Sequence, residues 1–93
     1  MLKSIRVRLL IEGRVQGVLY RVTAESKAKQ FGVTGWIRNL PSGKVEAIVE
    51  GPEDKVNEMI EWCKIGPIAA HVTDVKVEKK DHTGEYDDFR VLK

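Results

Sequence analysis

The chain has one cysteine, few aromatic residues and no long apolar run. Cys63 alone cannot form an intrachain disulfide or a cysteine-based zinc site, which favours a reducing compartment. The apolar run at residues 9–11 is far too short to span a bilayer, and no signal-peptide core follows Met1. We therefore expect a soluble, cytoplasmic protein that has no membrane partner.

The chain also lacks a strong charge of either sign. It has 16 Lys and Arg against 14 Asp and Glu, and the resulting net charge of +2 is too small to indicate a polyanionic partner. Apolar residues make up 42% of the chain and charged residues 32%, a balance typical of globular proteins. With 93 residues, we expect residues 1–93 to form a single domain with one two-layer core.

Hydrophobic periodicity predicts seven elements. Alternating apolar and polar residues predict strands near residues 5–11, 35–40, 45–49, 73–77 and 89–91. Helical spacing predicts one helix over about residues 19–31 and a second from Glu53 to the Gly66–Pro67 step. The order β-α-β-β-α-β-β is best satisfied by one mainly antiparallel sheet with both helices on a single face. The predicted fold class is therefore α+β, a ferredoxin-like two-layer sandwich.

Residues 13–21, which read GRVQGVLYR, form the most informative segment. A predicted strand passes there into a predicted helix through a loop bounded by Gly13 and Gly17. No Ser, Thr, Asp or Asn stands where a side chain would cap the first amides of the helix, and Arg21 places a cation at its positive end. Both features cost stability unless an anion binds nearby.

Simpler interpretations exist for each feature. Two glycines between a strand and a helix usually make a packing turn, and Asn39 could be only a turn residue before Pro41-Ser42-Gly43. Asn39 gains interest because it accompanies the glycine loop.

The two segments together resemble the paired signature of the acylphosphatases. The first runs from Gly13 through Arg21, and the second reads GWIRNLPSGKV from Gly35 to Val45 and is followed by Gly51. The similarity covers nearly the whole chain. It implies a compact ferredoxin-like hydrolase that splits the carboxyl-phosphate anhydride of acyl phosphates without a metal or other cofactor. The implied partner is a small-molecule acyl phosphate, and we expect a monomer that binds no nucleic acid.

The resemblance also implies roles for individual residues. Arg21 would bind the phosphoryl group, and Asn39 would position the attacking water. The backbone of the loop would form the phosphate cradle, with substrate-binding residues Val15, Gln16, Gly17, Val18, Leu19 and Tyr20. Two positions depart from the family pattern: Tyr20 replaces the usual Phe or Met, and Leu19 stands where many members have glycine.

The residue types suit this chemistry. A carboxylate leaving group departs without needing a proton, because its conjugate acid has a pKa of roughly 4 to 5. The planar guanidinium of Arg21 can contact two phosphate oxygens, and the Asn39 amide can both accept from a water and donate to the substrate. Neither motif contains a His, Asp or Glu suited to act as a base. We therefore hypothesise that a phosphoryl oxygen of the substrate takes the proton; a protein base revealed by a pH–rate profile and removed by one substitution would contradict this.

Other functions remain open at this stage. The loop lacks the Gly-Lys-Ser/Thr ending of a nucleotide-binding P-loop, and His71 and His82 have no motif-spaced partners for a metal. Ferredoxin-like sheets also bind single-stranded RNA, which would require exposed aromatic residues on adjacent central strands, and Trp36 has no evident partner there. A domain that only senses anions or supports a carbamoyl-transfer partner is the other alternative.

Overall fold

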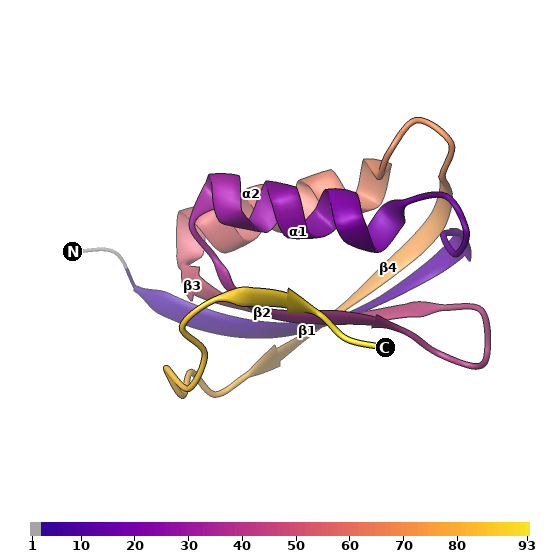
Figure 1. The fold of residues 1–93 in the computed structure, drawn as a ribbon. Helices are drawn as coiled ribbons and strands as arrows, with labels where there is room; N and C mark the ends of the chain where they lie inside the picture. Colours follow the sequence, from indigo (N-terminus) through magenta and orange to yellow (C-terminus); the bar gives the residue numbers. More distant parts are fainter. Residues whose placement is uncertain (1–2) are drawn as a thin grey trace.

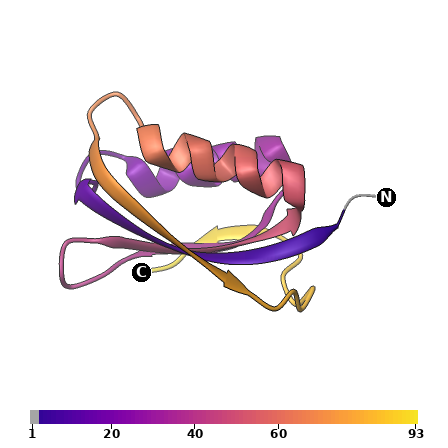
Figure 2. The ribbon, with the colours of Figure 1, turned by 180° about the vertical axis from the view of Figure 1, so that it is seen from behind.

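The computed structural model describes residues 3–93, which form two helices packed on one face of a five-stranded sheet (Figure 1). The strands are β1 (Ser4–Arg14), β2 (Thr34–Asn39), β3 (Val45–Pro52), β4 (His71–Lys80) and β5 (Phe89–Val91), and the helices are α1 (Tyr20–Phe31) and α2 (Glu53–Ile65). Seen from behind, β4 crosses in front of β1, and both helices again lie above the sheet (Figure 2). Within residues 3–93, neither helix has the length and apolar character needed to cross a membrane.

The sheet has the order β4-β1-β3-β2-β5. Its neighbouring strands are antiparallel except β2 and β5, which run parallel. This mixed sheet with both helices on one face confirms the predicted ferredoxin-like sandwich. Three strands, β1, β3 and β4, are longer than the pattern predicted, because β1 stays paired with both of its neighbours along most of its length. The loop between β4 and β5 accordingly begins only after Lys80.

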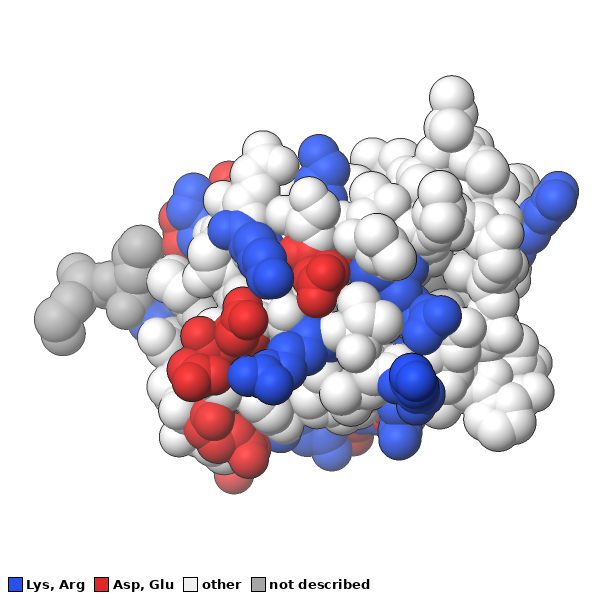
Figure 3. Space-filling model, in the orientation of Figure 1, with Lys and Arg blue, Asp and Glu red and all other residues white. Residues whose placement is uncertain are grey.

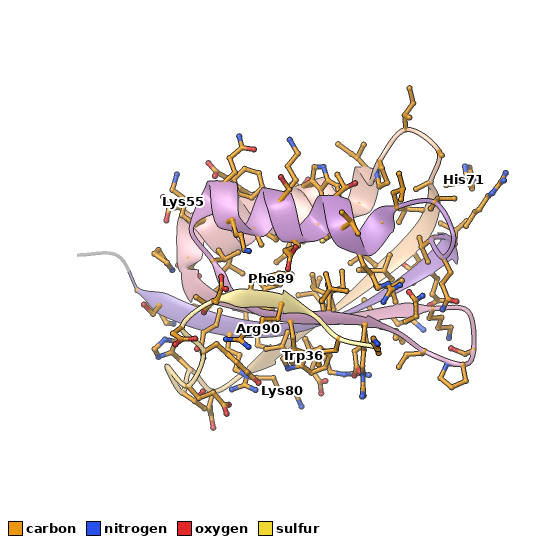
Figure 4. All side chains as sticks on the ribbon, viewed as in Figure 1. Trp36, Lys55, His71, Lys80, Phe89 and Arg90 are labelled. Carbon is orange, nitrogen blue, oxygen red and sulfur yellow. The ribbon has the colours of Figure 1, made fainter. Side chains whose placement is uncertain are left out.

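The core lies between the sheet and the helices. Alternate residues of the central strands face the helices and are buried, so that Leu9 of β1 stands opposite Ala47 of β3. Ala24 and Ala28 give α1 a small buried face, which lets the helix approach the sheet closely. Phe89 of β5 points into this layer, whereas Trp36 lies on the opposite face of the sheet (Figure 4).

The open face of the sheet carries paired ions. The Glu46 carboxylate is almost fully buried and accepts hydrogen bonds from Arg8 Nε at 2.6 Å and Arg38 Nε at 2.7 Å. Burial alone would raise the pKa of Glu46, but the two guanidinium groups outweigh it and hold that pKa below its ordinary value. The three side chains come from β3, β1 and β2, so they tie the three central strands together.

A second buried carboxylate, Glu50, holds the loop after β4 against this face. Its oxygens accept hydrogen bonds from the backbone amides of Thr83 at 2.8 Å and Gly84 at 3.1 Å. Arg6 of β1 donates to Glu85 and to the Tyr86 hydroxyl in the same loop. The central strand β1 therefore presents arginines to this face, not the stacking aromatic residue that a single-stranded RNA platform would need there.

We predict that Glu46→Gln destabilises the protein by about 1 to 3 kcal/mol near neutral pH, because hydrogen bonds to a charged group are lost. The pKa of Glu46 is lower in the folded protein than in the unfolded chain. Its contribution to the free energy of unfolding is therefore complete above the unfolded pKa and is lost as pH falls through the folded pKa. The gap between wild type and variant should therefore close below about pH 4. Urea unfolding across pH measures this, with the exposed Glu78→Gln as the control that should change little. A gap that stays constant on acidification would contradict the prediction.

Candidate functional site

A cleft of about 220 Å³ lies where β1 ends, β2 ends and α1 begins. Its lining includes four residues of the predicted cradle together with both residues expected to carry the chemistry. The lining residues are Val15, Gly17, Leu19, Tyr20, Arg21, Val22 and Asn39. The structure thus brings Arg21 and Asn39 to one cleft, although they are separated by a helix and most of a strand.

The two glycines of the loop have different roles. A Cβ on Gly13 would lie 2.1 Å from the backbone oxygen of His71, so this glycine allows β4 to approach β1 closely at a β-bulge. A Cβ on Gly17 would meet no atom within 4 Å, but the residue has a φ of 75°. Gly13 therefore fits the simpler packing interpretation, while Gly17 provides the turn that shapes the cleft.

The loop presents unpaired backbone amides. Leu19 has φ 64° and ψ 23°, a left-handed conformation, and the helical Tyr20 follows it directly. Such a change of hand turns successive N–H groups toward one point, the geometry of an anion-binding nest. Within residues 3–93, no N–H of residues 15–19 donates a hydrogen bond to a backbone or side-chain acceptor.

The start of α1 adds positive charge without compensation. The helix has no side-chain cap and no acidic residue in its first turn. Arg21 makes no salt bridge with any described residue, whereas three other arginines, Arg6, Arg8 and Arg38, are paired with glutamates. Its Nη1 donates to the Leu92 carbonyl oxygen at 3.1 Å, which holds the guanidinium without neutralising it. Cradle amides, helix dipole and Arg21 all favour an anion here.

Asn39 contributes an acceptor to the cleft. Its Oδ1 is buried and has no hydrogen-bond partner among the described residues. A buried carbonyl oxygen without a donor costs stability, and such atoms in native proteins are few and often functional. Asn39 ends β2, where it pairs with Val45 of β3, so the strand backbone fixes its place. Asn39 therefore stands in the cleft lining with an amide oxygen that is not committed to any other described residue.

Two predicted cradle residues do not line the cleft. Val18 packs against the hydrophobic core. Gln16 instead turns its side chain to the hairpin between β2 and β3, where Nε2 donates to the carbonyl oxygens of Leu40 at 2.8 Å and Lys44 at 2.9 Å. Only a backbone role was predicted for Gln16 from the sequence. Its side-chain link could not be predicted, because the two carbonyls lie near it only in the folded protein.

Tyr20 finds a partner for its hydroxyl in the core. The ring is 1% exposed, and the hydroxyl donates to the Cys63 carbonyl oxygen of α2 at 2.6 Å. Burial raises the pKa of Tyr20 above its ordinary value and raises that of the Cys63 thiol to about 12. Both groups therefore stay protonated at neutral pH, and neither provides a base to the cleft. The extra hydroxyl of Tyr20 fixes α1 to α2.

The two histidines lie away from the cleft lining. His71 begins β4, and His82 Nε2 is 4.0 Å from the Glu50 carboxylate on the open face. Among residues 3–93, no three His, Cys, Asp or Glu side chains come together in a way that could hold a metal ion.

Comparisons with known proteins show which proteins the chain resembles. The family model Acylphosphatase matches residues 7–91. A protein of Methylococcus capsulatus named Acylphosphatase is 48% identical over 88 residues, covering 95% of this chain and 96% of that one. The acylphosphatase structure from Coxiella burnetii superposes with a TM-score of 0.91 at 35% identity, over 96% of this chain and 93% of that one. The acylphosphatase structure from Bacillus subtilis gives 0.92 at 30% identity, over 96% and 99%.

We predict that Gln16→Met lowers the affinity for inorganic phosphate by about tenfold. Without the two hydrogen bonds from Gln16 to the hairpin, the loop must be ordered when the anion binds. Methionine matches glutamine in length but cannot donate to the two carbonyls. Isothermal titration calorimetry measures the affinity, and Gln30→Met on the exposed surface of α1 is the matched control. Unchanged phosphate affinity in Gln16→Met would show that the hydrogen bonds of Gln16 do not contribute to anion binding.

Proposed function

Because the chain belongs to the acylphosphatase family, we propose that it hydrolyses acyl phosphates without a metal ion, with Arg21 binding the phosphoryl group and Asn39 positioning the water. One observation carries this proposal. Arg21, which makes no salt bridge, and Asn39, whose amide oxygen has no partner among the described residues, line a single cleft with the loop whose backbone amides are free. The first two groups match the two needs of phosphoryl transfer, which are charge stabilisation and an oriented nucleophile.

The reaction forms one bond to phosphorus, breaks another, and moves one proton. The water oxygen attacks phosphorus, and the bond between phosphorus and the bridging oxygen breaks. The carboxylate leaves with the electron pair of that bond. One proton of the water passes to a phosphoryl oxygen, so the products are a carboxylate and inorganic phosphate. No acid is needed for the leaving group, because a carboxylate is a weak base.

Arg21 and the loop amides stabilise the charge that spreads over the phosphoryl oxygens. Fixed donors in a preorganised site stabilise such charge more than water does, because they need not reorient during the reaction. The Leu92 carbonyl holds one end of the guanidinium, which leaves its other N–H groups for the ligand. This arrangement supports binding of the phosphoryl group in one orientation.

Asn39 places the nucleophile. Its unpartnered Oδ1 can accept from a water, while the amide nitrogen can donate to that water or to a phosphoryl oxygen. An amide does not take up a proton at neutral pH, so Asn39 orients the water and does not act as a base. The protonated state of Tyr20 supports a substrate oxygen as the proton acceptor.

We propose further that the protein acts as a cytoplasmic monomer on a small-molecule substrate. The single buried cysteine suits a reducing compartment, and the small net charge gives no attraction to nucleic acid. The alternative of a non-catalytic anion sensor has less support, because an anion sensor would need Arg21 and the amides but not the unpartnered oxygen of Asn39.

Release of phosphate from acetyl phosphate or benzoyl phosphate by the purified protein tests the reaction class. We expect rapid hydrolysis of both with a chelator present and no detectable hydrolysis of an aryl phosphate monoester, whose leaving group is a stronger base. Loss of activity with the chelator, restored by added metal, would overturn metal independence. Binding of phosphate without turnover of either acyl phosphate would favour the anion sensor.

Two substitutions separate the proposed roles. Arg21→Ala should abolish phosphate binding and hydrolysis together, whereas Asn39→Ala should lower kcat by about 100-fold or more with KM changed by less than about threefold. The exposed Arg90→Ala and Asn57→Ala, both outside the cleft lining, are matched controls that should keep wild-type kinetics. Near-normal turnover by Asn39→Ala would refute its role in placing the water.

A further inference from the structure

Two large apolar side chains border the anion site and remain exposed. Leu19 is 74% exposed and Val22 is 62% exposed, yet both line the cleft beside Arg21. Their exposure means that folding gains little from their apolar surface. Apolar residues at this place do not help to bind a phosphoryl group, so they call for another explanation.

Leu19 also occupies a strained backbone position. A left-handed φ is unfavourable for a branched side chain and is tolerated best by glycine or asparagine. The conformation is fixed, because the Leu19 carbonyl oxygen accepts from both Thr23 Oγ1 at 2.8 Å and Thr23 N at 3.1 Å. A leucine held under strain with its side chain in solvent is the kind of feature that occurs at ligand contacts.

Within residues 3–93, the cleft lining carries no charge beyond the guanidinium that would bind phosphate. Arg21 is the one charged residue among the described residues that line it. In the orientation of Figure 1, the visible surface around the loop before α1 and the loop after α2 is mostly uncharged (Figure 3). A substrate with a second anionic group on its acyl part would find no further cation in this lining.

We propose that the site selects acyl phosphates whose acyl group is apolar and uncharged, and that the side chains of Leu19 and Val22 contact this group. The inference rests on the proposed function, since it takes the phosphoryl group as bound by Arg21 and the cradle. The acyl group then extends along the exposed N-terminal turn of α1, where it covers both side chains. The backbone strain at Leu19 is offset by this contact only when substrate is bound.

The test compares kcat/KM for hexanoyl phosphate, acetyl phosphate and succinyl phosphate. We expect hexanoyl phosphate to exceed acetyl phosphate by about tenfold, since added methylenes are partly buried in an open cleft. Succinyl phosphate carries a free carboxylate, so its kcat/KM should be lower than that of hexanoyl phosphate by about tenfold or more. Equal values for the three substrates would overturn the inference but leave the proposed function intact. Failure to hydrolyse any of them would overturn both.

Two variants assign the preference to the named side chains. Leu19→Asn suits the left-handed backbone and Val22→Thr keeps the shape of valine, so both variants should fold. Each should lower the ratio of hexanoyl to acetyl kcat/KM by about threefold, and this ratio cancels any general change in phosphoryl binding. Val77→Thr, at an exposed valine of β4 outside the cleft lining, is the control that should keep the wild-type ratio. Ratios unchanged in both cleft variants would overturn the proposed contact.

Discussion

The candidate site depends on one row of the sheet, in which Val45 of β3 pairs with Ile11 on one side and Asn39 on the other. Ile11 and Val45 are fully buried, so a shift of one residue would carry them to the open face and is strongly disfavoured. The same row brings the loop after β1 next to the end of β2. Gln16 then closes the gap by donating to the hairpin carbonyls of Leu40 and Lys44. The position of Asn39 relative to the cradle is therefore a consequence of core packing.

Sequence periodicity was enough for the fold, because each strand and helix buries one face of a single core. The uncapped helix start and the resemblance to the acylphosphatases pointed to Arg21 and Asn39, and the structure brings these two residues to one cleft. The sequence could not distinguish Gly13 from Gly17, whose roles differ only through the approach of the His71 backbone to one of them. The same limit applies to Gln16 and to the Leu92 carbonyl that holds Arg21, because both contacts join segments far apart in the sequence.

The arginines of the open face and the arginine of the cleft are held in different ways. On the open face, Arg8 and Arg38 share the buried Glu46, and Arg6 binds Glu85, so these charges serve the structure. At the cleft, Arg21 is held by a neutral carbonyl oxygen, which fixes its direction but leaves its charge uncompensated. A paired arginine would have to lose its carboxylate before it could bind a phosphoryl group. The contrast explains how a chain with nearly balanced charge can still present a strong local preference for an anion.

Several local costs meet at the start of α1: strain at Leu19, a helix without a cap, an unneutralised Arg21 and the unpartnered oxygen of Asn39. A single substitution at each position would remove the corresponding cost. Each unfavourable feature persists because the surrounding structure holds it. The buried Tyr20 hydroxyl ties the first turn of α1 to the Cys63 carbonyl of α2, while Thr23 fixes the backbone at Leu19. These bonds hold the first turn of α1 and the backbone at Leu19 in place. The unpaired groups therefore remain available to the ligand, and little reorganisation is needed when the ligand binds.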